Sequence, residues 1–584
     1  MTVVDAGDST VLSGETVGDA LALVPGVLIL ATGSRGGTSN AFIRGGDSNF
    51  TLVLLDGMPV NDSTEITGGS VNLQEASADF VERIEIVRGP ITSHYGPASL
   101  SGVVQLFTRR GTRAGVHGDV GADAGTASFW HGFARVSGVR GSGAWSFGGT
   151  WSQEKQRLGE ESFRGLELWG TADIPLAVGT RLSFTAHVAH ASASDYPESS
   201  GGPIYGSGLV RHSDPRDDTL SSRLESGASS SHHQRLLLGV FRRRLARSSP
   251  AVLTQVPAST ESTSLARVRI AYDMAIVSGA NTAIQGGILG QGEFGTNASI
   301  LHLPLALGGN TPGDYRKTEW TLGAYVGVQH QRGPVLLDSA LRVDVPSHEA
   351  VQFNPHVGLS WRIDKQGKTR ARASGASASK TPSFSAVASP RELGGNPQLH
   401  SEHALGADIG IEQALFAERV HVSATVFWAH YRDLIDFDFR TFQIVNRARV
   451  SAHGAEFAVS WRPHDSLLVD LPATWLSTKE MSGVPLLHRP RWHGGVRFSW
   501  LPFRRAALRI QTSSQSSSLD HELPVPQRDR VSGYSVAMIA ASWRLNDHWL
   551  LRSRVDNVTD RRYETLIGFQ GPRRAYSLGC LWTW

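Results

Sequence analysis

This chain of 584 residues has a single cysteine and only a small excess of positive charge. The single cysteine, Cys580, cannot form an internal disulfide bond, which excludes a disulfide-stabilised scaffold. The 56 basic and 53 acidic residues leave a net charge of only +3 and are interspersed. Because a nucleic-acid-binding protein concentrates its basic residues in a patch, we expect no nucleic-acid partner.

Long hydrophobic runs are missing as well. The longest apolar stretch, Ala20 to Ala31, is interrupted by Pro25 and Gly26, whereas a transmembrane helix needs about 20 apolar residues. Only helices and closed barrels satisfy every backbone polar group in lipid. The chain is therefore either a soluble protein or a membrane β-barrel, and the periodicity of its strands has to decide.

Catalytic and metal-binding spacings are not found either. No nucleophile and base stand at a diagnostic spacing, so we expect no enzyme and no cofactor. His232 and His233 are adjacent, and neighbours on a strand point to opposite faces, so we expect no shared metal ion there. The opening residues, MTVVDAGDST, also lack the basic and apolar regions of a signal peptide.

What the chain does contain is alternation of apolar and polar residues, from about residue 115 to the end. It is explicit in Arg181 to His190 and in Val420 to Trp428, and it recurs at 144–151, 320–328 and 536–543. Strands of about ten residues with one apolar face suit an outer-membrane barrel, although a soluble sandwich or propeller gives the same pattern. We expect the longer Gly- and Pro-containing stretches, Asp195 to Asp218 and Gln291 to Tyr315, to be extracellular loops.

The end of the chain favours the barrel. Every second residue is apolar up to a terminal aromatic residue, which resembles the C-terminal signature of outer-membrane barrels. The resemblance implies that the barrel-assembly machinery recognises Tyr576, Leu578, Trp582 and Trp584.

Residues 1–113 differ from the rest and predict a small α+β domain, followed by a barrel over 114–584. Thr16 to Leu23 is typical of a short amphipathic helix, ended by Pro25 and Gly26. Thr51 to Asp56 and Val81 to Arg88 are predicted strands, because Gly57 follows the first and Gly89 and Pro90 follow the second.

Five consecutive segments of this domain resemble the plug of TonB-dependent outer-membrane receptors. They are ETVGDALALVPGV (15–27), AFIRGG (41–46), TLVLLDGMPVND (51–62), VERIEIVRGP (81–90) and HYGPASLSGVVQLFTRRG (94–111). Further similarities occur at TPSF (381–384), GGNPQLHSE (394–402), DNVTDRRYE (556–564) and GPRRAYSLG (571–579). The resemblance covers essentially the whole chain. It implies an antiparallel transmembrane barrel of about 22 strands with the plug inside its lumen.

The resemblance also implies sites. Charged plug residues would be costly in a dry core, but they can pair with charges on a polar barrel wall. We expect this docking role for Arg44, Glu82, Glu85 and Arg88. Ligand is expected where apical plug loops meet extracellular barrel loops, and Gly33 to Asn40 and Asn61 to Ser70 are suitably polar. The predicted ligand residues are Ser34, Arg35, Thr38, Asn40, Asn61, Asp62, Ser63, Thr64 and Glu65.

By the same resemblance the function is active uptake of a scarce, large nutrient across the outer membrane. A plugged barrel needs energy, which the TonB, ExbB and ExbD proteins supply through a short TonB box ahead of the plug. In relatives the box lies just upstream of a stretch similar to residues 2–8, so we expect the box and signal peptide, if present, upstream of Met1. The expected partners are thus this complex, outer-membrane lipid and the barrel-assembly machinery.

The ligand and two alternatives stay open. The plug is most similar to that of cobalamin receptors, and siderophore receptors share much of it. Heme ranks third, because no histidine lies between Lys380 and Leu399. The alternatives are a signalling or ligand-binding barrel that does not transport, and a decayed relative without a TonB box.

Overall fold

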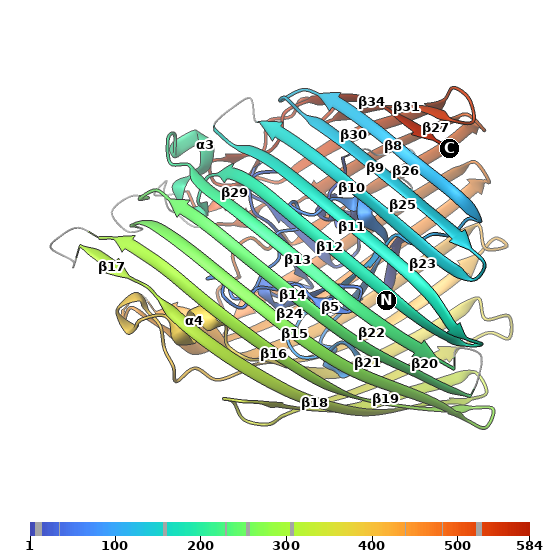
Figure 1. Ribbon diagram of the computed structural model, residues 1–584, viewed down its shortest axis with the longest axis horizontal. Coiled ribbons are helices and arrows are strands. Elements are labelled where there is room, and N and C mark those ends of the chain that lie inside the picture. Colours follow the sequence, from blue (N-terminus) through green and yellow to red (C-terminus); the bar gives the residue numbers. More distant parts are fainter. Residues whose placement is uncertain are drawn as a thin grey trace.

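The computed structural model describes residues 1–5, 14–33, 35–155, 160–227, 231–252, 257–303, 309–438, 440–481, 483–520 and 528–584. Its strands form one tilted ring, and the N-terminal residues lie inside this ring (Figure 1). The predicted combination of a barrel and an internal plug is therefore confirmed.

The plug is built around a five-stranded sheet with the order β1-β6-β7-β4-β5, in which only β4 and β7 are parallel. The strands of this sheet are β1 (Thr2–Asp5), β4 (Thr51–Leu55), β5 (Met58–Pro59), β6 (Val81–Arg88) and β7 (Gly102–Thr108). The plug also contains a separate antiparallel pair, β2 (Val27–Ala31) with β3 (Ser39–Ile43). The helices are α1 (Val17–Leu21) and α2 (Thr92–Tyr95), with short 3-10 helices at Ser48–Phe50 and Ala78–Phe80. The strands predicted at 51–56 and 81–88 thus correspond to β4 and β6.

Helix α1 is shorter than the predicted 16–23. Thr16 is its N-cap: its hydroxyl accepts a hydrogen bond from the Asp19 N–H at 3.1 Å, and the Asp19 carboxylate accepts from the Thr16 N–H at 3.0 Å. This reciprocal capping box fixes the first turn. Asp56 and Gly57 then form the tight β4–β5 turn with φ of 46° and 91°, a conformation that suits the Asp-Gly pair.

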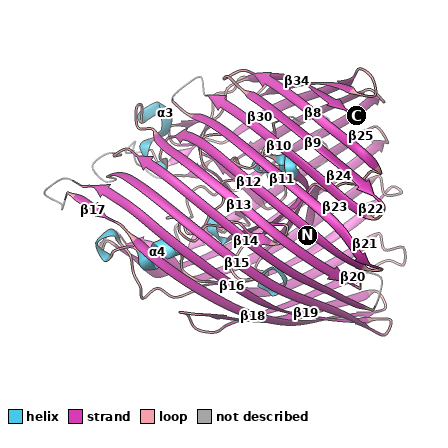
Figure 2. Cartoon of the chain, in the orientation of Figure 1, coloured by secondary structure: helices cyan, strands magenta, loops and turns pink. Residues whose placement is uncertain are grey.

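Within the described residues the barrel is a closed ring of 22 antiparallel strands, and β34 pairs with β8 to complete it (Figure 2). The strands are β8 (Gly115–Gly125), β9 (Trp130–Arg140), β10 (Gly143–Lys155), β11 (Ser162–Ala177), β12 (Thr180–Asp195), β13 (Arg211–Ser226), β14 (His232–Ser249), β15 (Ala258–Ser278), β16 (Thr282–His302), β18 (Tyr315–Arg332), β19 (Val335–Pro346), β20 (Gln352–Arg362), β21 (Thr369–Lys380), β22 (Glu402–Leu415), β23 (Val420–Asp438), β24 (Gln443–His464), β25 (Leu467–Glu480), β26 (Trp492–Phe503), β27 (Ala506–Gln515), β30 (Tyr534–Arg544), β31 (Trp549–Asp556) and β34. The last of these spans Ala575–Thr583, and the three-residue β17 (Asn310–Pro312) is an added segment on β16.

Connections at the two ends of the barrel differ in length. At one end they are as short as residues 141–142, 178–179 and 504–505. At the other they reach 381–401, 516–533 and 557–574, and they hold α3 (Gly202–Tyr205), α4 (Phe384–Ala388) and the short pairs β28 (Ser518–Leu519) with β29 (Arg530–Val531) and β32 (Glu564–Leu566) with β33 (Phe569–Gln570). Because outer-membrane barrels have short periplasmic turns, the long connections mark the extracellular end.

The predicted extents of two loops and the predicted length of the strands are wrong. The loop expected at 195–218 covers only 196–210, because β12 and β13 extend into it. Most of the loop expected at 291–315 is strand, since β16 continues to His302. Strands here reach 22 residues, as in β24, rather than about ten. They continue past the lipid at the extracellular end, where pairing still satisfies their backbone groups.

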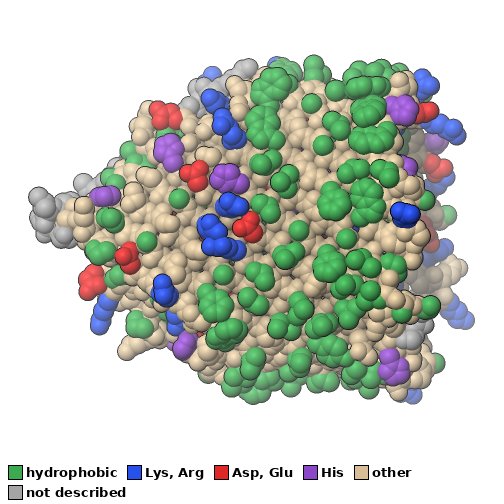
Figure 3. Space-filling view, in the orientation of Figure 1, with side chains coloured by type: hydrophobic (Ala, Val, Ile, Leu, Met, Phe, Trp, Pro, Cys, Tyr) green, Lys and Arg blue, Asp and Glu red, His purple; other side chains and the backbone are tan. Residues whose placement is uncertain are grey.

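Apolar side chains form a broad band over the outside of the strands, and charged side chains gather toward the two ends (Figure 3). Exposed examples are Ile288, Ile409 and Val426, with 64%, 69% and 65% of their surface accessible. Exposed tryptophans near the periplasmic end are Trp361, Trp461, Trp500, Trp543, Trp549, Trp582 and Trp584; those nearer the loops are Trp130, Trp151, Trp320, Trp428 and Trp492. Two aromatic zones flanking an apolar band match a lipid-facing wall. Among the described residues, no helix has the length and apolar character that a membrane-spanning helix requires.

Candidate ligand-binding and plug-docking site

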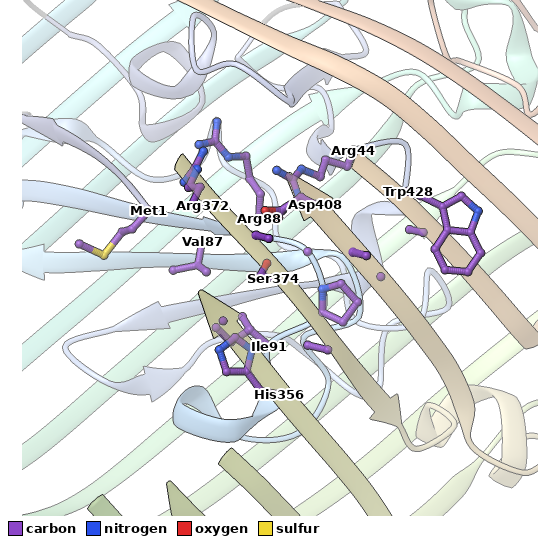
Figure 4. A pocket seen from close by; sticks show the side chains of 18 of the residues that line it. Met1, Arg44, Val87, Arg88, Ile91, His356, Arg372, Ser374, Asp408 and Trp428 are labelled. Carbon is purple, nitrogen blue, oxygen red and sulfur yellow. The ribbon is translucent and has the colours of Figure 1, made fainter. Parts of the chain in front are cut away.

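Arg44 connects the plug to the barrel wall. It lies just after β3, and its guanidinium donates to Glu456 Oε1 on β24 at 2.8 Å and to Asp408 Oδ2 on β22 at 2.9 Å. Figure 4 shows Arg44 and Asp408 facing each other beside Arg88 and Arg372. Its side chain also lies 4.8 Å from the centre of the Phe427 ring, and it is only 6% exposed. A buried cation held by two carboxylates is a strong, directional link.

Arg88, at the end of β6, reaches the same carboxylate. Its Nη1 lies 3.6 Å from Glu456 Oε2 and donates to the carbonyl oxygen of Pro25 at 2.5 Å. The other two predicted docking residues lie differently. The Glu85 carboxylate accepts from Arg83 Nε at 3.0 Å on its own strand, and Glu82 has no ion-pair partner among the described residues. Side chains of β6 alternate, so only some of its charges can face the wall.

A second group of contacts was not predicted from the sequence. Asp79 Oδ2 lies 2.9 Å from His131 Nε2 on β9, and the Ser77 N–H donates to Glu167 on β11 at 2.8 Å. Burial alone would raise the pKa of Asp79, but His131 and the Ser77 hydroxyl hold it well below its usual range. Neither Ser77 nor Asp79 belongs to a recognisable motif, and their partners lie dozens of residues away.

The predicted ligand loop 61–70 contacts the wall in this conformation. Ser63 Oγ donates to Glu293 Oε2 at 2.5 Å, Glu65 Oε1 accepts from Arg247 Nη2 at 3.1 Å, and Asp62 lies 3.6 Å from Arg243. Thr64 hydrogen-bonds to Asp62, while Asn61 holds the loop together by hydrogen bonds to Val53, Thr51 and Gly69.

An extracellular loop covers this plug loop. The Phe384 N–H donates to the Ser63 carbonyl at 2.8 Å, and Ser385 Oγ donates to the Glu65 carbonyl at 2.9 Å. Both residues belong to α4 in the 381–401 connection. A ligand that displaces this connection would therefore act directly on the plug loop.

The other predicted loop, 33–40, lies against β11 and β13. Arg35 is 7% exposed and stacks at 4.8 Å over the Phe163 ring, and Thr38 Oγ1 accepts from Arg211 Nη2 at 3.3 Å. Asn40 lies within β3, opposite Leu30. Ser34 lies outside the described residues. A role of these residues in ligand binding stays a prediction.

Several of the wall residues that meet the plug are arginines, which the sequence prediction missed. Arg267 donates to the carbonyls of Pro59 and Asn61 at 2.9 and 2.8 Å, and Arg489 donates to Asp47 at 2.5 Å. Arg243 and Arg247 on β14 are two further examples. The alternation of side chains along β14 could have revealed the last two, because it turns Arg243 and Arg247 inward while Arg242 and Arg244 face out.

Separate cavities remain between plug and wall. One cavity of about 240 Å³ is lined by Arg44, Arg88, His356 and Asp408, among others (Figure 4). Another cavity, of about 330 Å³, is lined by Glu15, Asp19, Arg35 and Arg554, among others. Both are lined by charged groups of each sign. In the part of the chain that the structure describes, no three His, Cys, Asp or Glu side chains are placed to hold a metal ion.

Two family models match the chain. The TonB dependent receptor-like β-barrel matches residues 137–558, and the TonB-dependent Receptor Plug Domain matches residues 1–103. The vitamin B12 transporter BtuB of Vibrio vulnificus (strain CMCP6) is 22% identical over 600 residues, which cover 96% of this chain and 88% of the transporter.

Solved structures are similar in fold. The siderophore receptor PirA of Acinetobacter baumannii is 15% identical with a TM-score of 0.81, over 100% of this chain and 98% of the receptor. The ferripyoverdine receptor of Pseudomonas aeruginosa is also 15% identical, with a TM-score of 0.83 over 100% of this chain and 86% of the receptor. Both likenesses concern the fold alone.

The barrel match covers more than half of the chain, and it agrees with the closed ring, the internal plug and the apolar outer band. The family comprises receptors and transporters rather than enzymes. The chain belongs to the TonB-dependent receptor family and is an outer-membrane β-barrel of a transport family, closed by its own N-terminal plug.

Proposed function

We propose that this chain takes up a bulky chelate of the cobalamin or siderophore type by TonB-dependent active transport. The observation that carries the proposal is the plugged lumen. Ion pairs from Arg44, Asp62 and Glu65 tie the plug to β14, β22 and β24 of the wall, so a large solute can pass only if the plug moves. The outer membrane has no supply of nucleoside triphosphate, so the energy that moves the plug has to come from another part of the cell.

The ligand class rests on the loops and the relatives. Loops 33–40 and 61–70 offer hydroxyl, amide and charged groups, which suit a large polar ligand rather than an apolar one. The similarity to a vitamin B12 transporter along nearly the whole chain makes a cobalamin the first ligand to test, and ferric siderophores the second. Contacts from α4 to the 61–70 loop provide a route from bound ligand to plug.

On this proposal, the TonB, ExbB and ExbD proteins drive the plug movement. The barrel-assembly machinery inserts the barrel by binding its last strand, where Tyr576, Leu578, Trp582 and Trp584 are 49%, 69%, 38% and 43% exposed. All four lie on the outward face and are accessible to another protein before the barrel closes.

The test is uptake by intact cells. The protein is expressed in the outer membrane of a Gram-negative strain without its own cobalamin receptor, with or without TonB, and radiolabelled cyanocobalamin is supplied at limiting concentration. We expect accumulation only with TonB and surface binding in both strains. Equal binding without accumulation would identify a non-transporting receptor. Failure to bind cobalamin together with TonB-dependent uptake of a ferric siderophore would assign the second ligand class.

A further inference from the structure

One half of the periplasmic rim of the barrel carries an excess of positive charge. It consists of the six turns between β18 and β31 with the strand residues that flank them, all of which are described. They comprise residues 332–334, 362–368, 416–419, 462–466, 504–505 and 544–548. These residues, which we call the basic half-rim, include nine Lys and Arg against four Asp and Glu. Within the described chain, none of the nine cations forms an ion pair with a carboxylate.

A Ser-Trp-Arg motif occurs three times at this rim, near the periplasmic ends of β20, β24 and β30. The three copies are residues 360–362, 460–462 and 542–544. Their tryptophans, Trp361, Trp461 and Trp543, face outward and are 46%, 46% and 48% exposed. Tryptophan side chains of a barrel wall lie at the level of the lipid headgroups. The arginine that follows, one residue nearer the periplasm, therefore stands at the membrane surface.

Backbone hydrogen bonds hold two of these arginines against an arginine of the neighbouring turn. The Arg462 N–H donates to the carbonyl oxygen of Arg419, and the Arg544 N–H donates to that of Arg505, each at 2.7 Å. Two pairs of arginines are thus fixed side by side at the edge of the membrane. Because like charges repel, each pair is stabilised by an anion that both guanidinium groups contact.

Exposed apolar side chains lie in or beside the same turns. Ile363, Phe416, Phe503 and Leu545 are 44%, 77%, 67% and 48% exposed. Their exposure to water is unfavourable, and insertion among acyl chains removes this cost. A soluble acidic protein or glycan would neutralise the arginines but leave this apolar surface in water. A lipid with an anionic headgroup covers both the charges and the apolar side chains.

We propose that the basic half-rim binds anionic phospholipids of the inner leaflet in preference to zwitterionic ones. One headgroup phosphate lies between Arg419 and Arg462, and another lies between Arg505 and Arg544, where the guanidinium groups donate charge-assisted hydrogen bonds to it. The acyl chains follow the neighbouring tryptophans toward the membrane centre. A zwitterionic lipid offers the same phosphate, but its ammonium group is repelled by the paired arginines.

The experiment measures lipid binding by the full chain in detergent micelles, by native mass spectrometry. The probes are dioleoyl phosphatidylglycerol, which is anionic, and dioleoyl phosphatidylethanolamine, which is zwitterionic and has the same acyl chains. The test variant removes the three arginines of the motif through Arg362→Gln, Arg462→Gln and Arg544→Gln. A matched control removes three exposed cations from the other half of the same rim, none of which follows a tryptophan, through Arg113→Gln, Arg140→Gln and Arg181→Gln.

We expect the unmodified protein to bind phosphatidylglycerol about tenfold more tightly than phosphatidylethanolamine. The test variant should bind phosphatidylglycerol about fivefold more weakly at each site, with phosphatidylethanolamine binding unchanged, and the control variant should match the unmodified protein. Equal affinity of the unmodified protein for the two lipids would overturn the proposal, and so would equal binding of phosphatidylglycerol by the test and control variants. Displacement of phosphatidylglycerol by soluble polyglutamate would assign the surface to a soluble polyanion instead.

Folding of each variant is checked by the heat-dependent shift of a barrel on an unheated gel. A further variant with Arg362→Lys, Arg462→Lys and Arg544→Lys keeps the charge, and it should bind phosphatidylglycerol more tightly than the test variant does. Should the test variant fail to fold, Arg505→Gln alone takes its place, because Arg505 lies in a two-residue turn outside the strands. It should weaken phosphatidylglycerol binding at one site about fivefold, and unchanged binding would contradict the proposal.

Discussion

Arg44 adopts a left-handed backbone conformation, with φ of 50°, that a residue with a side chain rarely occupies. Such a conformation costs about 1–3 kcal/mol and persists only where its surroundings determine it. Here the surroundings are Glu456 and Asp408, which the strained turn brings within hydrogen-bonding distance. The local cost is offset by the link between plug and wall.

Replacing Arg44 with Ala should weaken the docking of the plug by about 3–5 kcal/mol, because Asp408 and much of Glu456 would be left buried without a counter-charge. Hydrogen exchange of β6 amides, measured by mass spectrometry, reports this loss. The matched control is Arg83→Ala, since Arg83 is 42% exposed and, among the described residues, its ion-pair partner Glu85 and the Phe107 ring beneath it both belong to the plug. It should cost less than about 1 kcal/mol. Equal effects of the two substitutions would contradict the assigned role of Arg44.

Glu15, beside α1, gives the plug a dependence on pH. Burial raises the pKa of this carboxyl from 4.5 to about 7. The folded plug therefore binds this proton more tightly than the unfolded chain. The resulting stability is fully present below pH 4.5 and is lost as pH rises through about 7.

The variant Glu15→Gln mimics the protonated acid and should stabilise the plug at pH 8 by up to about 3 kcal/mol. It should also flatten the pH dependence between 4.5 and 7. Chemical denaturation of the purified protein at pH 5 and pH 8 measures both effects. An unchanged slope would show that Glu15 is not the titrating group.

At the scale of elements, the barrel closes along a seam between β8 and β34. Gly118 and Trp584 exchange backbone hydrogen bonds at 3.2 and 3.0 Å, and the Trp584 ring covers Gly118 on the outside. This ring also stacks on Trp582, with centroids 4.7 Å apart. The absence of a side chain at Gly118 is what lets the terminal aromatic lie flat on the seam.

Substituting Gly118 with Ala would place a Cβ atom 1.9 Å from the Trp584 ring, so the ring must move. We expect a loss of about 1–3 kcal/mol at the seam and a smaller folded fraction in the heat-dependent gel assay. Gly132→Ala on β9 is the control, because its nearest atom would be a carbonyl oxygen 3.9 Å away. If both variants fold to the same extent, the seam does not depend on Gly118.

At the scale of the whole molecule, the central question is whether the plug loop leaves the wall during uptake. Thr64 on the plug and Gly295 on β16 can answer it. A Cβ at Gly295 would lie 2.8 Å from Cγ2 of Thr64, the place that the Sγ of a cysteine at position 64 can take, and a disulfide separates a Cβ from the partner Sγ by about 3 Å. The Phe384 ring, 2.4 Å from the same Cβ, has to shift to make room for it. The only native cysteine, Cys580, lies on the far strand β34 and does not compete.

The variant Thr64→Cys/Gly295→Cys should lose uptake when oxidised and recover it after reduction, because the cross-link holds the loop on the wall. Uptake of labelled ligand by cells is measured before and after dithiothreitol, with each single cysteine variant as the reference. Full uptake by protein shown to be cross-linked would mean that transport proceeds with this loop in place.

Sequence by itself determined the elements whose signals are local. Alternation located the barrel strands, and the Gly and Pro residues after β4 and β6 marked their ends, because strand formation depends on neighbours along the chain. The sequence also predicted that Arg44 and Arg88 pair with charges on the wall, since charges within a plug require partners. Both lie within ion-pair distance of Glu456, and their docking role stays a prediction.

Only the tertiary structure decided which wall residues pair with the charged residues of the plug. Arg44 and Glu456 are 412 positions apart, and Ser385 reaches Glu65 across 320. Such contacts depend on strand register and on how the ring closes around the plug, and these are properties of the whole barrel rather than of any segment.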